Sequence, residues 1–161
     1  MHIDPLLDHL DLVPIIAQWH WQEWGTTDIE GDVETRTKKL RTDLRRDRVP
    51  VMFVALDGDV PLGTSALSAS DMTTHPELTP WLANIYVAPA ARGRGIAKAL
   101  VLYTMQQAMA FGHPHLYLYT HTARGLYEKL GWQEIGEEWY EGHLNTLMRC
   151  DITSGSVPAA Q

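Results

Sequence analysis

The first third of the chain has a pattern of apolar and polar positions that predicts one short strand and two helices. Residues 2–6 predict a short strand. Apolar side chains then recur at helical spacing over 11–24, with Asp11 as a candidate N-cap. The charge-rich segment 30–48 carries an apolar stripe and ends before Pro50, which a helix does not readily continue through. This segment predicts a second, amphipathic helix.

The remainder of the chain alternates strands and helices. Apolar runs at 51–56 and 62–69 are joined through an Asp-Gly-Asp turn at 57–59, which predicts a β-hairpin. The elements that follow are a strand, a helix, a strand, a short helix and two strands: 81–87, 95–111, 116–120, 123–130, 132–138 and 144–150. The last two strands pair across a turn at Glu141 and Gly142. The predicted order is β-α-α-β-β-β-α-β-α-β-β.

Composition limits the organisation and the function classes. A chain of 161 residues, 45% of them hydrophobic, can bury one core, so we expect one domain over 1–150 and a disordered tail over 151–161. The net charge of −7 argues against a nucleic-acid partner. No apolar run has the length of a membrane span, and Cys150 is the single cysteine, so we expect a cytoplasmic protein without a membrane partner. The sequence is compatible with a homodimer and does not determine the oligomeric state.

The segment 84–100 carries the strongest functional signal, because a strand passes through a proline turn and an arginine- and glycine-rich loop directly into a helix. Backbone N–H groups at Gly93, Arg94, Gly95 and Ile96 would lie unpaired at the helix start, where the macrodipole is positive. Glycine lets a phosphate approach the main chain. We therefore expect a pyrophosphate here; a tight turn alone would explain the glycines but not the arginines beside them.

Two common phosphate folds do not fit this loop. A P-loop needs Gly-Lys-Ser/Thr, whereas Ile96, Ala97 and Lys98 follow Gly95. A dinucleotide fingerprint counted from Gly93 would need glycine at position 98, and the loop lies at mid-chain. Neither a nucleoside triphosphate site nor a dinucleotide site is indicated.

What remains is the pattern Arg-x-x-Gly-x-Ala at Arg92, Gly95 and Ala97, after a strand that ends in Val-x-Pro. This pattern resembles the acyl-CoA signature of the GNAT acetyltransferase superfamily. The segment 123–132 is similar to the family's helix ending in Tyr-x-x-x-Gly-Phe, with Trp132 in place of Phe. The resemblance implies an α/β (α+β) GNAT fold, in which a mixed, mostly antiparallel sheet of about seven strands with splayed central strands is flanked by about four helices.

The resemblance implies acetyl-CoA as co-substrate and assigns its contacts. The strands at 81–87 and 116–120 would diverge, so that backbone groups of Ile85, Tyr86 and Val87 pair with the pantetheine amides. The following loop would hold the pyrophosphate through six residues: Arg92, Gly93, Arg94, Gly95, Ile96 and Ala97.

Direct acetyl transfer needs a neutral amine, a group that polarises the thioester carbonyl and a proton donor for the departing thiolate. By resemblance to the family's tyrosine on this helix, Tyr127 is the donor, and the backbone N–H near Val87 polarises the carbonyl; a tyrosine buried for packing alone is the alternative. The base stays open among four candidates: His121 just after the strand at 116–120, Asp71 and Glu77 in the loop before Trp81, and Tyr119 through a water chain.

The acceptor follows least from the sequence. We favour a small-molecule primary amine, with a peptide or protein N-terminus and a non-catalytic acyl-CoA-binding sensor as alternatives. The acidic net charge mildly favours cationic amines. No metal is expected, because His113 and His115 lack further ligands at suitable spacing. The aromatic side chains in the elements expected to form the acceptor pocket are Trp19, Trp21, Trp24, Trp81, Trp139 and Tyr140.

Overall fold

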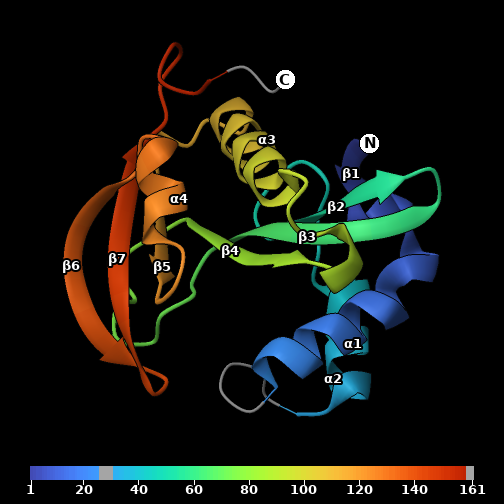
Figure 1. Ribbon diagram of the computed structural model, residues 1–161. Coiled ribbons are helices and arrows are strands. Elements are labelled where there is room, and N and C mark those ends of the chain that lie inside the picture. Colours follow the sequence, from blue (N-terminus) through green and yellow to red (C-terminus); the bar gives the residue numbers. More distant parts are fainter. Residues whose placement is uncertain (26–30, 159–161) are drawn as a thin grey trace.

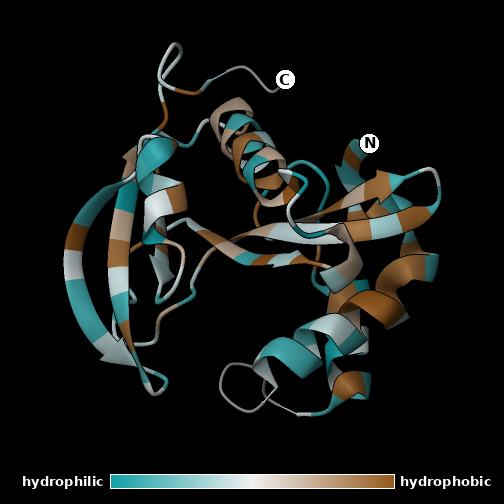
Figure 2. Ribbon diagram, in the orientation of Figure 1, coloured by the Kyte–Doolittle hydropathy of each residue, from teal (hydrophilic) through white to brown (hydrophobic). Residues whose placement is uncertain are grey.

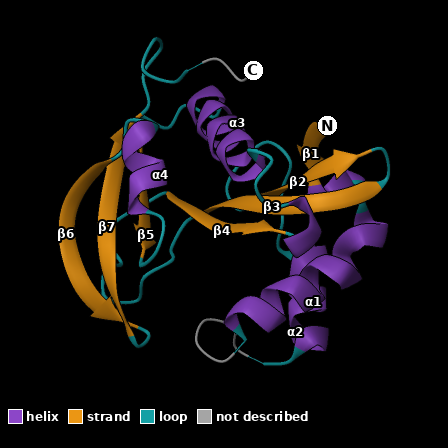
Figure 3. Cartoon of the chain, in the orientation of Figure 1, coloured by secondary structure: helices purple, strands orange, loops and turns teal. Residues whose placement is uncertain are grey.

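The computed structural model describes residues 1–25 and 31–158. Within them, seven strands form one mixed sheet in the spatial order β1-β2-β3-β4-β5-β7-β6 (Figure 3). The strands are β1 His2–Pro5, β2 Val51–Asp57, β3 Val60–Ser68, β4 Trp81–Val87, β5 His115–Thr120, β6 Gln133–Tyr140 and β7 His143–Asp151. The α-helices are α1 Val13–Trp24, α2 Val33–Thr42, α3 Ile96–Ala110 and α4 Arg124–Lys129. The predicted element order is confirmed.

The first helix begins later than the sequence predicts. Residues Leu10–Leu12 form a separate 3₁₀ turn, and α1 starts at Val13 with Pro14 in its first turn. Proline suits that position because its missing N–H would have no helical partner there. Leu12 occupies the N-cap without a side-chain hydrogen bond, so the prediction of Asp11 as the cap is wrong.

The second helix ends well before the predicted residue 48. Its start is capped by Asp32, whose Oδ1 accepts a hydrogen bond from Thr35 N at 2.9 Å. At its end, Arg45 Nη1 donates to the carbonyls of residues 42–44 at 3.0–3.4 Å. This arginine satisfies carbonyls that further helical turns would have paired, so the chain leaves the helix at Thr42. Glu30, the predicted start, lies outside the described residues.

Strand β2 is buried on both faces, which explains its continuous apolar sequence. Val51, Phe53 and Ala55 pack with side chains of α3, whereas Met52, Val54 and Leu56 pack with α1 and α2. Figure 1 shows α3 on one face of this part of the sheet and α1 with α2 on the other. Full burial of one such side chain contributes about 1.5–3 kcal/mol. The two faces together hold the first four strands in place.

The sheet divides between β4 and β5. These parallel strands pair only at Trp81 and Tyr117, with Tyr117 N donating to Pro80 O at 3.0 Å. Beyond this point β4 turns away from β5, as Figure 1 shows. The predicted splayed central strands are therefore confirmed, and the divergence leaves one edge of β4 without a neighbouring strand.

The C-terminal segment is more closely tied to the domain than a tail beginning at 151 implies. Asp151 is the last residue of β7, and Ile152 is buried, with its N–H donating to Pro114 O at 2.9 Å. Val157 packs against the core cluster next to α3. Residues 159–161 lie outside the described part of the chain, and disorder there stays a prediction.

Candidate active site

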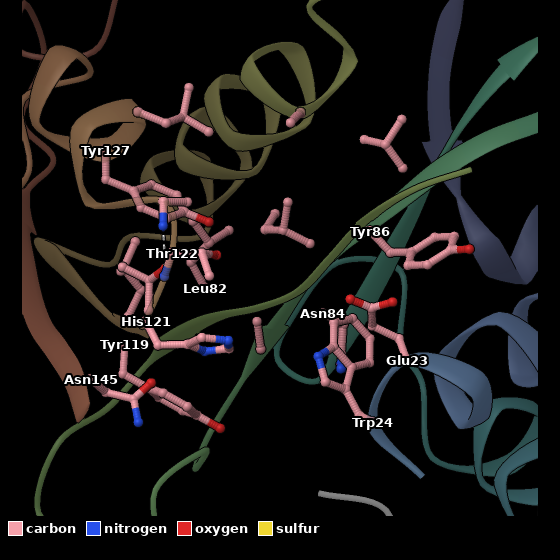
Figure 4. Close-up of a pocket in the computed structure, with 18 of the residues that line it drawn as sticks. Glu23, Trp24, Leu82, Asn84, Tyr86, Tyr119, His121, Thr122, Tyr127 and Asn145 are labelled. Atoms are coloured by element: carbon pink, nitrogen blue, oxygen red, sulfur yellow. Dashed lines mark hydrogen bonds between the residues drawn. The ribbon is translucent and has the colours of Figure 1, made fainter. Parts of the chain in front are cut away.

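A cleft of about 740 Å³ opens where β4 and β5 separate. Its walls come from the end of α1, from β4, from the loop that begins α3, from the β5–α4 connection and from the β6–β7 hairpin. In Figure 4, Tyr119, His121 and Tyr127 lie on one side, and Glu23, Trp24 and Asn84 on the other. The cleft thus joins segments that are far apart in the sequence.

The loop at one end is shaped by two glycines in the left-handed region. Gly93 and Gly95 have φ angles of +75° and +76°, and Gly95 is the N-cap of α3. A Cβ at either position would meet no atom within 4 Å, so glycine is required here by conformation and leaves open space. The first helical hydrogen bond runs from Ala99 N to Gly95 O, so the preceding N–H groups have no helical acceptor. These donors and the helix dipole suit an anion.

The side chains of this loop differ in their positions. Gly93, Gly95, Ile96 and Ala97 line the cleft, and their contacts to the co-substrate stay a prediction. Arg92 also lines it, and its Nε donates to Val87 O at 3.1 Å. Arg94 is exposed and does not line the cleft.

The open edge of β4 presents backbone groups to the cleft. Ala88 N donates to Leu62 O on β3 at 2.9 Å, and neighbouring strand residues direct their backbone groups to opposite sides. Val87 therefore directs its N–H and C=O away from β3, where its C=O meets Arg92. Ile85, Tyr86 and Val87 all line the cleft. Burial raises the pKa of the Tyr86 phenol, against the effect of the nearby Arg92 charge.

Tyr127 lies in the opposite wall, on α4. It is 7% exposed, and burial raises the pKa of its phenol to about 12. The phenol therefore stays protonated at neutral pH and can donate. Its ring meets Trp132 edge-on, with centroids 6.1 Å apart. The turn before α4 is held by Thr120 Oγ1, which accepts from Ala123 N at 3.0 Å.

His121 is stacked on His143 of the β6–β7 hairpin. Their ring centroids are 4.0 Å apart and their planes differ by 10°. Burial lowers the pKa of His121, the His143 charge lowers it further, and Glu23 across the cleft opposes both. A neutral imidazole in this wall is able to accept a proton.

The loop before β4 is hydrogen-bonded to the β6–β7 hairpin. His75 Nε2 lies 2.5 Å from Glu138 Oε2, and Thr73 N donates to the Tyr140 hydroxyl at 3.2 Å. Glu77 is exposed and pairs with His75 at 3.1 Å, so this candidate base does not line the cleft. Asp71, in the same loop, does line it.

Several cleft residues were not identified from the sequence: Glu23, Leu82, Asn84, His143 and Asn145. Asn84 had a readable signal, because it is a polar residue within an apolar strand. Glu23 lies in the second half of α1, which is hydrophilic where the first half is hydrophobic (Figure 2). Nothing local indicated that this half meets the cleft.

Cys150 is no candidate for a nucleophile, because it is 4% exposed and burial raises the pKa of its thiol to about 11. Over the ranges 1–25 and 31–158, no group of three or more His, Cys, Asp or Glu side chains is placed to hold a metal ion. Over the same ranges, no helix has the length and apolar character needed to cross a membrane.

Comparison with known proteins places the chain among acetyltransferases. A family model described as "Acetyltransferase (GNAT) family" matches residues 13–132. The "Uncharacterized N-acetyltransferase YjgM" of Escherichia coli (strain K12) is 43% identical over 58 residues, which are 34% of this chain and 35% of that protein.

Solved structures with a similar fold include an aminoglycoside 6'-N-acetyltransferase complexed with coenzyme A, with a TM-score of 0.73, 16% identity and full coverage of both chains. Another is YncA of Salmonella typhimurium, described as a putative acetyltransferase with its cofactor acetyl-CoA, with a TM-score of 0.69, 15% identity and full coverage of both chains. At these identities the likeness shows the fold alone. That fold is the one predicted.

Proposed function

The chain belongs to the acetyltransferase (GNAT) family, and on that premise we propose that it moves an acetyl group from acetyl-CoA to a primary amine by direct attack in a ternary complex. The observation that carries the proposal is the separation of β4 from β5 directly beside the glycine loop. It supplies, in one cleft, free strand-edge amides for the pantetheine and free helix N–H groups for the pyrophosphate.

The loop end of the cleft fits the charged part of acetyl-CoA. Gly93 and Gly95 leave open space where side chains would stand, and the N–H groups at the start of α3 lack helical acceptors. Arg92 and Lys98 add positive charge on the same side. The cleft volume of about 740 Å³ lies within the usual range for ligand pockets, roughly 300–1,000 Å³. In this proposal Arg94 does not contact the pyrophosphate and screens its negative charge only at long range.

The reacting groups are supplied by both walls. Val87 N–H faces the open edge and can donate to the thioester oxygen as negative charge develops there. Tyr127, a neutral phenol, can protonate the departing CoA thiolate. His121, with its lowered pKa, is the favoured acceptor of the amine proton, directly or through water, and Asp71 remains the alternative.

The far end of the cleft favours a cationic acceptor. Glu23 of α1, Asp71 of the loop before β4 and Glu141 of the β6–β7 hairpin line the cleft away from the start of α3, where Arg92 and Lys98 line it. An ammonium group is attracted to these carboxylates before it loses its proton, and the aromatic residues Trp24, Tyr119 and Tyr140 also line the cleft. We therefore propose a small-molecule amine of net positive charge.

Two measurements test the function. Acetyl-CoA should raise the melting temperature, with about 2.7 kcal/mol of stabilisation at a hundredfold excess over Kd. ATP and NAD should not, and equal shifts with all three would contradict the assignment. A panel of amines and short peptides, assayed by release of the CoA thiol, then identifies the acceptor. Tight binding of acetyl-CoA without turnover on any member would favour the sensor.

A further inference from the structure

Strand β4 contains a bulge at the point where it faces the cleft. Ala83 pairs with Ala66 and Tyr86 pairs with Thr64, so two residues of β4, Asn84 and Ile85, lie opposite Ser65 alone. Asn84 has a φ of +51°, in the left-handed region. The bulge changes the phase of the strand, so that the residues after it, up to Val87, present different backbone groups to the open edge than a regular strand would.

A chain of buried and partly buried hydrogen bonds ends on this bulge. Arg36 Nη2 lies 3.0 Å from His20 Nδ1, and His20 Nε2 lies 2.9 Å from Thr64 Oγ1. Thr64 Oγ1 donates to Asn84 O at 2.9 Å. Arg36 also reaches the Asn84 side chain, with Nη2 at 3.5 Å from Oδ1. Residues of α2, α1 and β3 thus connect in sequence to one backbone carbonyl of β4.

The direction of every bond in this chain follows from its first member. A guanidinium only donates, so His20 Nδ1 must accept and must be unprotonated. His20 Nε2 then carries the hydrogen and donates to Thr64, which leaves the hydroxyl hydrogen of Thr64 for Asn84 O. No member can be reversed without leaving a buried group unpaired.

His20 is held in this state by its surroundings. His20 and Thr64 are both 0% exposed. Burial, and next the Arg36 charge, lower the pKa of His20 to about 3, so its ring is neutral at any pH at which the enzyme would work. The ring packs against Trp24, with centroids 5.2 Å apart. A neutral, fully buried histidine suits a fixed support and does not suit proton transfer.

We propose that His20 and Thr64 are positioning residues, which hold the Asn84 carbonyl in the bulge and so fix the edge of β4 that receives the co-substrate. The Thr64 hydroxyl gives this carbonyl a donor inside the bulge, where the regular strand ladder is interrupted. The inference rests on the proposed function, because the edge matters only where pantetheine amides pair with it. A slip of the bulge would turn Val87 N–H toward β3 and away from the cleft.

A matched set of variants separates positioning from general stability. Thr64→Val removes the hydroxyl at nearly constant volume, and Thr64→Ser restores it. His20→Phe removes both ring nitrogens, whereas His20→Gln keeps one donor and one acceptor. Thr104→Val is the control, because Thr104 is equally buried and its Oγ1 lies 2.8 Å from Leu100 O and 2.7 Å from Ser65 Oγ, so it contacts the side chain of the residue opposite the bulge rather than the Asn84 carbonyl.

Acetyl-CoA affinity is measured by calorimetry and the melting temperature is measured on the same preparations. We expect Thr64→Val and His20→Phe each to weaken acetyl-CoA binding about tenfold, the equivalent of one hydrogen bond of ordinary strength. Thr64→Ser should retain the wild-type Kd, His20→Gln should retain most of it, and Thr104→Val should lower only the melting temperature. Because the bonds form one chain, the double variant should lose little more than either single variant.

The inference is overturned if folded Thr64→Val binds acetyl-CoA as the wild type does, or if Thr104→Val weakens binding equally. The wild type provides a test that needs no variant: the ¹⁵N shifts of His20 should report hydrogen on Nε2, and hydrogen on Nδ1 would contradict the chain. If the wild type itself does not bind acetyl-CoA, the proposed function fails, and this outcome is distinct from either result above.

Discussion

The two ends of the cleft are constructed differently. At the loop end, the groups proposed to bind the pyrophosphate are consecutive backbone atoms at the start of α3, set by two glycines with positive φ. At the proposed acceptor end, the cleft is lined by side chains from α1, the loop before β4, the β5–α4 connection and the hairpin. The first end is therefore specified locally by sequence, whereas the second exists only once tertiary packing has assembled it.

The largest expected effect concerns the wall that lies between these ends. Tyr127→Phe should lower kcat by about 10²-fold, at the low end for general acid catalysis, while the acetyl-CoA Kd changes little, since only the departing thiolate needs the hydroxyl. If the hydroxyl serves structure instead, the free energy of unfolding falls by about 1 kcal/mol and turnover per folded molecule persists. Kinetics and melting on one preparation decide between these results.

A second test asks whether the loop end depends on its backbone. Gly95→Val should weaken acetyl-CoA binding about tenfold or more, because a β-branched residue at φ +76° is strained by roughly 1–2 kcal/mol and occupies space meant for a phosphate. Gly112→Val is the matched control at the other end of α3, where φ is +87° and a Cβ would also meet nothing. The control should lower stability and leave Kd intact; equal weakening by both would show that the loop has no special role.

The groups at the proposed acceptor end should determine how the reaction rate depends on pH. The rate should rise to a plateau as pH increases, because the amine and its proton acceptor must both be unprotonated. Burial lowers the pKa of His121 and the His143 charge lowers it further, so His143→Phe, which removes only the charge, should raise that pKa part of the way toward its ordinary value. The His121 limb of the profile should then move to higher pH.

NMR titration of the His121 ring measures this shift without any acceptor. If the titration of His121 is unchanged in His143→Phe, the charge of His143 does not influence the pKa of His121. If Asp71→Asn removes the rise and His121→Ala does not, Asp71 is the base. If neither does, the amine loses its proton through water.

The smallest expected effect concerns the ion pair between His75, in the loop before β4, and Glu138 of β6. Hydrogen bonds that the His75 ring donates to Glu138, and next to Glu77, raise the pKa of His75, so folding takes up protons at this site. Its contribution is complete below the usual histidine pKa and is lost as pH rises through the raised value. Glu138→Gln should therefore lower the free energy of unfolding only slightly, and only at mildly acidic pH, where His75 is protonated and Glu138 is still ionised. Glu137→Gln on the same strand is the control, and denaturant unfolding at two pH values measures both; equal losses at both pH values would contradict this ion pair.

The sequence was sufficient for the element order and for the loop, but not for everything that tertiary contacts decide. The end of α2 depends on Arg45 reaching the carbonyls of residues 42–44, which no periodicity reveals. The position of Arg94 outside the cleft depends on the two left-handed glycines that flank it. His143 joins His121 only through the β5–β7 pairing and the hairpin, so the stacked pair could not be predicted from either segment.

The burial of Cys150 has a practical consequence for the chemistry proposed. It is the single cysteine of the chain, and its thiol is both covered and protonated at neutral pH. Disulfide-exchange dyes react with thiolates, so the folded protein should contribute almost no background colour to an assay that counts free CoA. A stoichiometric signal from the protein alone would then report unfolding, which makes the same reagent an internal check on the integrity of every variant.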